Sequence, residues 1–218
     1  MSLTQHGVVR ADHPTEHRLV TWEDLAVVVS ETGPDPLGHL ELLSGLVPHG
    51  PVVPLRFGTS AVDEDAVRTE VLARSAARLR GHLDRLDGVA ELHAYLRFDE
   101  EAALRAVHEE NPGLRLGDGL DLSARIKTGE RIAHLLVAWR RARARVLLEP
   151  VSALAKAEAS LPDAEPTTER RAFLLPVDKI GTARKLITAL DGECVAPLPA
   201  FTFLTEPTEP AQASRWGW

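Results

Sequence analysis

The sequence predicts an α+β protein in which helices cover one face of an antiparallel sheet, and this pattern occurs twice along the chain. Residues 63–86 have the apolar spacing of an amphipathic helix, and residues 89–98 alternate between apolar and polar side chains as a half-buried strand does. Residues 171–205 add a strand, a helix and a second extended segment.

A β-hairpin is predicted near the N-terminus, where the Glu23-Asp24 pair separates two apolar runs within residues 19–30. A short helix follows, with Asp35 as its N-cap and Pro36 as its first residue. We expect one apolar face on this helix, formed by Leu37, Leu40, Leu43 and Val47.

The next three segments are an extended stretch, a long helix and a strand. Residues 51–57 should be extended because Pro54 disfavours a helical conformation in the residue before it. The helix at residues 63–86 should bury a stripe made of Val67, Val71, Leu79, Leu83 and Leu86. The strand at residues 89–98 should leave one face largely in water, formed by Glu91, His93, Tyr95 and Arg97.

A segment rich in turn-forming residues, 111–119, predicts a boundary between two domains, at residues 1–113 and 114–206. The second domain should begin with a long helical region at residues 122–160, which Pro150 either kinks or divides into two helices. Residues 162–168 should form a loop, and residues 207–218 a flexible tail. In this tail Trp216 and Trp218 are either disordered or an anchor for another protein.

Composition narrows the class of protein. The 218 residues are 44% hydrophobic and carry a formal net charge of -7. This charge disfavours nucleic acid and anionic membrane surfaces as partners, because both would repel the protein. The chain has neither a leader segment nor an apolar run near the roughly 20 residues of a membrane span, so we expect it in the cytoplasm. Cys194 is the only cysteine, which excludes an intramolecular disulfide and a thiolate metal cluster.

Motifs for catalysis, cofactors or metals are not found. The nine histidines lack metal-ligand spacing, and no serine lies in a G-x-S-x-G elbow. The pair Gly117-x-Gly119 precedes a helix, but it lacks the third glycine of a dinucleotide site and the lysine of a P-loop, which favours a simple turn. We therefore expect a protein that is not an enzyme and that holds no cofactor or metal.

Two groups of residues are candidates for binding another protein. The first is Arg56 and Phe57, within an apolar extended run that ends in glycine. A buried arginine needs a paired charge, so a structural ion pair with a neighbouring carboxylate is favoured over an exposed binding role for Arg56.

The second group is a cluster of four arginines within residues 140–145, which begins with Arg140 and Arg141. On a helix these four side chains spread around the circumference. A solvated or ion-paired surface is therefore favoured over a surface that holds an acidic partner or RNA.

Four motifs in order along the chain match one known family. V-x-P-L-R-F-G-T is matched by residues 52–59, and R-I-x-x-G-E-x-V/I-A by residues 125–133, after which Arg140 and Arg141 follow. A-F-L-V is matched by residues 172–175, and G-P-x-P-P-Y-S-F is echoed by residues 196–203. The chain thus resembles gas vesicle proteins F and L, the GvpF/GvpL family.

The resemblance implies an N-terminal domain with a modified ferredoxin-like sheet and a C-terminal domain of long helices with a small ferredoxin-like α+β unit. It also implies a role in gas vesicle assembly, through binding of the GvpA-type shell protein and other accessory proteins. No catalytic residue transfers from the family. We expect the contact around Arg56 and Phe57. The first strand of the family is reduced here to residues 6–9, as an outer strand of the first sheet.

Two other classes are weighed against this one. A small-molecule enzyme or cofactor binder would use the ferredoxin-like sheet as the floor of a deep pocket with clustered polar side chains. An RNA-binding ferredoxin-like module is disfavoured, because aromatic-basic stacking motifs are missing and the net charge has the wrong sign.

Overall fold

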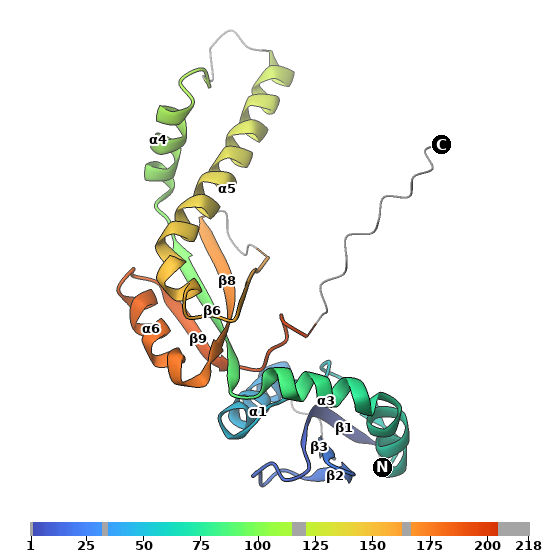
Figure 1. The fold of residues 1–218 in the computed structure, drawn as a ribbon. Coiled ribbons are helices and arrows are strands. Elements are labelled where there is room, and N and C mark those ends of the chain that lie inside the picture. The colour runs from blue at the N-terminus through green and yellow to red at the C-terminus, as the bar shows by residue number, and fades with distance from the viewer. Residues whose placement is uncertain (1, 32–34, 115–120, 163–166, 205–218) are drawn as a thin grey trace, which may run out of the picture. The chain divides into compact units, whose positions relative to one another are not determined.

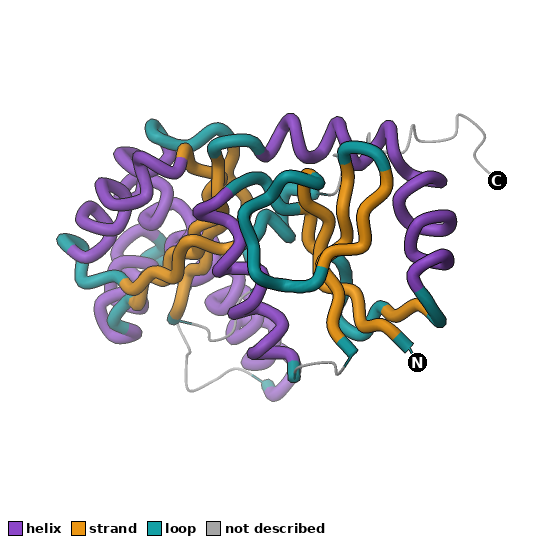
Figure 2. Tube along the Cα trace, turned by 90° about the horizontal axis from the view of Figure 1, so that it is seen from below, coloured by secondary structure: helices purple, strands orange, loops and turns teal. Residues whose placement is uncertain are grey.

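The computed structural model describes residues 2–31, 35–114, 121–162 and 167–204, and it has an α+β fold with two antiparallel sheets (Figures 1 and 2). The α+β class is thereby confirmed. The chain divides into two compact units, each built from separate stretches of sequence. Unit 1 comprises residues 1–92, 174–180 and 195–218, and unit 2 comprises residues 93–173 and 181–194. The domain boundary after residue 113 and the ferredoxin-like topologies stay predictions.

The sheet of unit 1 has the strand order β2-β3-β1-β4, and β5 also pairs with β1. The predicted hairpin is confirmed as β2 and β3, which are joined by a turn in which Glu23 has a φ of 52°. The expected outer position of the first strand is wrong, because β1 pairs with β3 on one side and with β4 and β5 on the other. The strands are β1 (Leu3–Arg10), β2 (Leu19–Trp22), β3 (Leu25–Ser30), β4 (Val53–Pro54) and β5 (Ser60–Ala61).

The long helix of unit 1 contains a π-helical stretch that changes which side chains face the sheet. It consists of α2 (Glu64–Ala66), the π-helical residues Val67–Ala73 and α3 (Arg74–Leu86). In a π-helix the hydrogen bond spans five residues, so the residue five positions after Val67 returns to the same face. Leu72 is therefore fully buried, whereas Val71, which we expected in the stripe, is only half-buried.

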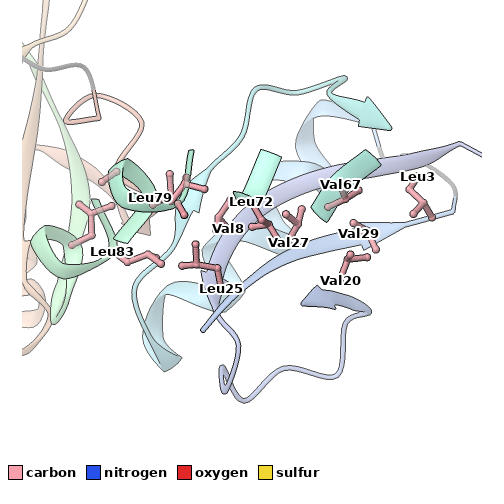
Figure 3. Packing of buried hydrophobic residues seen from close by; sticks show 14 of the residues in the cluster. Leu3, Val8, Val20, Leu25, Val27, Val29, Val67, Leu72, Leu79 and Leu83 are labelled. Atoms are coloured by element: carbon pink, nitrogen blue, oxygen red, sulfur yellow. The ribbon is translucent and has the colours of Figure 1, made fainter. Parts of the chain in front are cut away.

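The main core of unit 1 lies between this helix and one face of the sheet. In Figure 3, Leu72 lies beside Val8 and Val27, and Val67 lies beside Val29. Further along α3, Leu79 and Leu83 are buried in the same cluster. The alternation of side chains along β1 and β3 places these residues on a single face of the sheet.

The helix α1 (Pro36–Leu46) packs on the other face of β1. Its predicted cap is confirmed, because the Gly38 backbone N–H donates to Asp35 Oδ1 at 2.8 Å. A Cβ atom on Gly7 would lie 2.8 Å from Leu43 Cδ2, so only glycine lets α1 approach β1 this closely. The predicted apolar face is only partly correct, since Leu37 is 63% exposed. A 3-10 helix, Val47–His49, follows α1.

The second sheet has the strand order β7-β8-β6-β9. Its strands are β6 (Val89–Arg97), β7 (Ala157–Ser160), β8 (Thr168–Pro176) and β9 (Glu193–Leu198). The expected wet face of β6 is wrong at Glu91, which is 1% exposed. Its carboxylate accepts hydrogen bonds from Thr202 Oγ1 at 2.5 Å and from the Thr202 backbone N–H at 3.0 Å. A short-range pattern cannot reveal this partner, which lies far along the chain.

The remaining helices are α4 (Glu100–Glu110), α5 (Leu122–Ser152) and α6 (Ile180–Thr188), with a 3-10 helix, Val177–Lys179, before α6. α4 and α5 run side by side (Figure 1). The helical region expected to reach residue 160 is wrong at its end, because α5 stops two residues after Pro150 and residues 157–160 form β7. The extended segment expected to residue 205 is too long, since β9 ends at Leu198.

Several expectations fall outside the described residues: the turn at Gly117 and Gly119, most of the loop at 162–168, and the tail at 207–218 with its two tryptophans. Within the described ranges, no helix combines the length and the apolar character that crossing a bilayer requires.

The π-helical register gives a direct test. Leu72→Ala should lower the free energy of unfolding by about 2–5 kcal/mol, because it opens a cavity in the core. Val71→Ala should cost clearly less, because Val71 is only half-buried. Urea denaturation of the two variants measures the difference, and equal losses would contradict the register.

Candidate protein-binding site

The motif residues 56–59 form a tight turn. Both the backbone N–H and the hydroxyl of Thr59 donate to the carbonyl oxygen of Arg56, at 3.1 and 2.6 Å. Gly58 occupies the third position with a φ of 83°, in the left-handed region that a turn of type II requires at this position. Glycine and threonine in the motif are thus explained by the backbone of the turn.

Central strand β1 holds this turn at both ends. The Leu55 N–H donates to the carbonyl oxygen of His6, and the Gln5 N–H donates to the carbonyl oxygen of Thr59, both at 2.9 Å. The turn is therefore anchored to the middle of the sheet, although it lies on the surface. A surface loop fixed in this way can present side chains without a large ordering cost on binding.

Arg56 and Phe57 are both exposed at the tip of the turn. Phe57 is 47% exposed, and the described residues contain no carboxylate that pairs with Arg56. The structural ion pair that we favoured for Arg56 is therefore not found in the described part of the chain. The apolar residues around Arg56 suggested a buried strand, but the strand ends before the arginine. The chain turns outward at Arg56 instead of continuing into the interior.

A pair of buried histidines lies behind the turn. His6 and His39 are 0% and 3% exposed, and their Nδ1 atoms are 3.0 Å apart. The ring of His39 also contacts Phe57 edge to face, at 5.6 Å between centroids. His6 reaches this position because a β-bulge in β1, between Gln5 and Gly7, turns its side chain toward α1.

The hydrogen-bond partners assign the protons of this pair. His39 Nε2 lies 3.3 Å from the Leu55 carbonyl oxygen, which only accepts, so Nε2 carries a proton. In neutral His39 the Nδ1 atom is then an acceptor, and His6 Nδ1 donates to it. His6 Nε2 in turn accepts from the hydroxyl of Ser30, at 2.9 Å. With both rings neutral, every hydrogen bond in the series from the Ser30 hydroxyl through His6 and His39 to the Leu55 carbonyl oxygen has one donor and one acceptor.

Burial lowers the pKa of His6 from 6.5 to about 4, with smaller contributions from the neighbouring His39 and His17. His6 thus stays neutral at physiological pH. The histidine pair is a support for the turn that is sensitive to acid.

The second candidate group is split between the interior and the surface. Arg140 is 3% exposed, and its Nε donates to Glu169 Oε2 at 3.2 Å; Glu169 Oε1 accepts from Arg171 Nε at 3.1 Å. Arg141 is exposed, as are Arg143 and Arg145. The expected surface role is therefore wrong for Arg140, whose ion pair fixes α5 to β8. Glu169 was not predicted as a buried residue, because it lies in the charged run Glu169-Arg170-Arg171 at the start of β8, which resembles a surface segment.

Hollows in the surface are open and modest in size. One in unit 1 measures about 340 Å³ and is lined in part by Glu16, His17, Glu41 and His49. A groove beside α4 measures about 410 Å³, and its lining includes Leu104, Val107 and Ile132. Within the described residues, no group of three or more histidine, cysteine or carboxylate side chains is arranged to hold a metal ion.

Comparison with known proteins identifies the family. A family model described as gas vesicle synthesis protein GvpL/GvpF matches residues 4–205. The chain belongs to the GvpL/GvpF family. Gas vesicle protein F of Streptomyces sp. (strain CB03234) is 27% identical to this chain, over 94% of the chain and 100% of that relative. Membership gives the chain a role in gas vesicle synthesis.

Two crystal structures share the fold. GvpF from Microcystis aeruginosa has a TM-score of 0.76 at 16% identity, over 94% of this chain and 99% of that chain. GvpF from Anabaena sp. PCC7120 has a TM-score of 0.75 at 18% identity, over 94% of this chain and 98% of that chain. The resemblance inferred from the four motifs is confirmed at the level of the family.

The histidine pair predicts a loss of stability in acid. Unfolded His6 takes up a proton below pH 6.5, whereas the folded protein resists protonation until about pH 4. The contribution of neutral His6 is therefore complete above pH 6.5 and is lost as the pH falls toward 4, by on the order of 3 kcal/mol in total. Urea denaturation between pH 7 and 4 should show a flatter pH dependence for His6→Gln than for the parent.

His108→Gln is the control, because His108 is an exposed histidine. It should keep the pH dependence of the parent protein. If His6→Gln and His108→Gln gave the same curves, the buried histidine pair would not be the source of the effect.

The buried ion cluster gives another test. Glu169→Gln should lower the free energy of unfolding by about 3–5 kcal/mol, because two buried arginines lose their shared carboxylate. Glu158→Gln should cost less than about 1 kcal/mol, because Glu158 approaches Arg171 from the surface at 3.6 Å and is 41% exposed. Similar values for both variants in urea denaturation would show that burial of the pair is unimportant.

Proposed function

We propose that this chain is a non-enzymatic assembly protein of the gas vesicle, which binds the GvpA-type shell protein through Arg56 and Phe57. It acts in the cytoplasm and on the growing vesicle, together with other accessory proteins, and uses no cofactor. The exposed pair of arginine and aromatic ring on an anchored turn is the observation that carries the proposal.

The chemistry of the two side chains suits a protein partner. Arginine and large aromatic residues contribute most of the binding energy in many interfaces, because one side chain combines apolar area with directed hydrogen bonds. The Phe57 ring contacts the His39 ring in an edge-to-face arrangement. The exposed part of Phe57 remains available to an apolar partner.

The physical need for such a protein comes from the shell subunit. A small, strongly apolar subunit aggregates before assembly unless its exposed surface is covered for a time. A chain with a net charge of -7 remains soluble while it holds such a subunit. Binding and release, without a chemical step, are sufficient for this role.

A small-molecule binder or enzyme is the alternative function. The hollow lined by Glu16, His17, Glu41 and His49 is the feature that favours it, because polar side chains gather there. The hollow is open to solvent on the surface of unit 1, whereas small-molecule sites enclose most of the ligand. Assembly therefore remains the better-supported function.

The test is retention of the shell protein by the purified chain. Phe57→Ala and Arg56→Ala should each weaken binding by at least about 2 kcal/mol, or more than tenfold, as for central interface residues. Phe201→Ala is the matched control, because Phe201 is a surface phenylalanine of the same unit and is 42% exposed. Its binding should equal that of the parent.

Circular dichroism and urea denaturation establish that each variant is folded before binding is compared. Unchanged retention by both turn variants would remove the site assignment. Turnover of a metabolite by the purified protein, abolished by substitution of Glu41 or His49, would favour the alternative function.

A further inference from the structure

An apolar stripe lies exposed along the first half of α5. Leu122 and Ile126 are 74% and 54% exposed, and Ala133 is exposed as well. With 3.6 residues per turn, these three residues and Val137 share one face of the helix. The stripe is separate from the turn at Arg56 and Phe57, which belongs to unit 1.

Two copies of the stripe fit each other when the two α5 helices lie antiparallel. If a second α5 lies antiparallel with its centre between residues 129 and 130, Leu122 faces Val137 of the second copy and Ile126 faces Ala133. A large side chain thus meets a smaller one at each level, which is how facing helices interdigitate. Gly129 lies at the centre of this arrangement, where the absence of a side chain permits close approach.

A hollow next to Val137 provides space for the larger side chain. It measures about 130 Å³, and its apolar lining includes Phe98, Ala103, Ala133, Leu136 and Val137. In the antiparallel arrangement Leu122 of the second copy lies at the level of this hollow. The match between an exposed leucine and an apolar recess is repeated at the other end of the stripe by symmetry.

The charges beside the stripe fit the same arrangement. Lys127 and Glu130 lie on one flank, and neither forms an ion pair with another described residue. In the antiparallel pair the two Glu130 side chains lie within about 1.5 Å of the same level, and each Lys127 lies about 3 Å along the axis from the level of Glu130 in the second copy, so two lysines flank the two carboxylates. The two Arg125 side chains are separated by about 13 Å along the axis, so they do not repel each other strongly.

We propose that the exposed face of α5 around Gly129 pairs antiparallel with α5 of a second copy, so that the chain forms a two-fold symmetric dimer. The occupant of the apolar stripe is therefore another molecule of the same protein. A single helix pair is a small interface, so the dimer is weak and depends on concentration.

Sedimentation of the full chain over a range of concentrations tests the proposal. The parent protein should shift from monomer to dimer as concentration rises. Ile126→Glu should weaken the dimer at least tenfold, because a charge replaces apolar contact at the interface. Val146→Glu is the matched control, since Val146 is 62% exposed on the same helix but lies outside the stripe, and it should leave dimerisation unchanged.

The reciprocal pair of charges gives a second measurement. Glu130→Lys should weaken the dimer, because it faces Lys127 of the second copy with a like charge. The double variant Lys127→Glu, Glu130→Lys restores opposite charges and should recover dimerisation. A structural role of either residue within one chain would not produce this recovery in the dimer.

Three outcomes would overturn the proposal: a parent chain that stays monomeric at every soluble concentration, a dimer that Ile126→Glu leaves intact, or a double variant that fails to recover. A monomeric parent whose Ile126→Glu variant loses binding to another gas vesicle protein would assign the stripe to that partner instead.

Discussion

Close packing of α1 against β1 is the constraint on which the candidate site depends. It is possible because position 7 carries no side chain, and the β-bulge beside it turns His6 toward the same helix. His39 of α1 then meets His6, and together they connect Ser30 to the carbonyl oxygen of Leu55. A surface turn is thus held by a chain of hydrogen bonds that starts inside the sheet.

The sequence predicted those parts of the fold that depend on local patterns. The hairpin around Glu23, the cap at Asp35 and the strand at residues 89–97 follow from turn chemistry, capping and alternation, which involve near neighbours. The π-helical stretch was missed because Val71 and Leu72 are both apolar, and only the packing of the sheet decides which one turns inward. Element types were therefore easier to predict than the exact faces of the helices.

Buried charged residues were the other feature that the sequence did not predict. Glu91, Arg140 and Glu169 each have a hydrogen-bond partner distant in sequence, and the residues next to them in the chain do not show that they are buried. Family motifs did not resolve this, because the pair Arg140 and Arg141 reads as one basic unit although one residue is buried and the other is exposed. A motif records which residues occur together, and the fold assigns them to different tasks.

The same distinction clarifies the turn at residues 56–59. Gly58 is required by its φ, and Thr59 closes the turn with two hydrogen bonds. The backbone of the turn does not need an arginine at position 56, where only the carbonyl oxygen takes part. Phe57 makes one ring contact and leaves much of its surface in water. Since folding accounts for the last two residues of the turn at 56–59 and not for its first two, Arg56 and Phe57 are the residues for which an external partner supplies a physical reason.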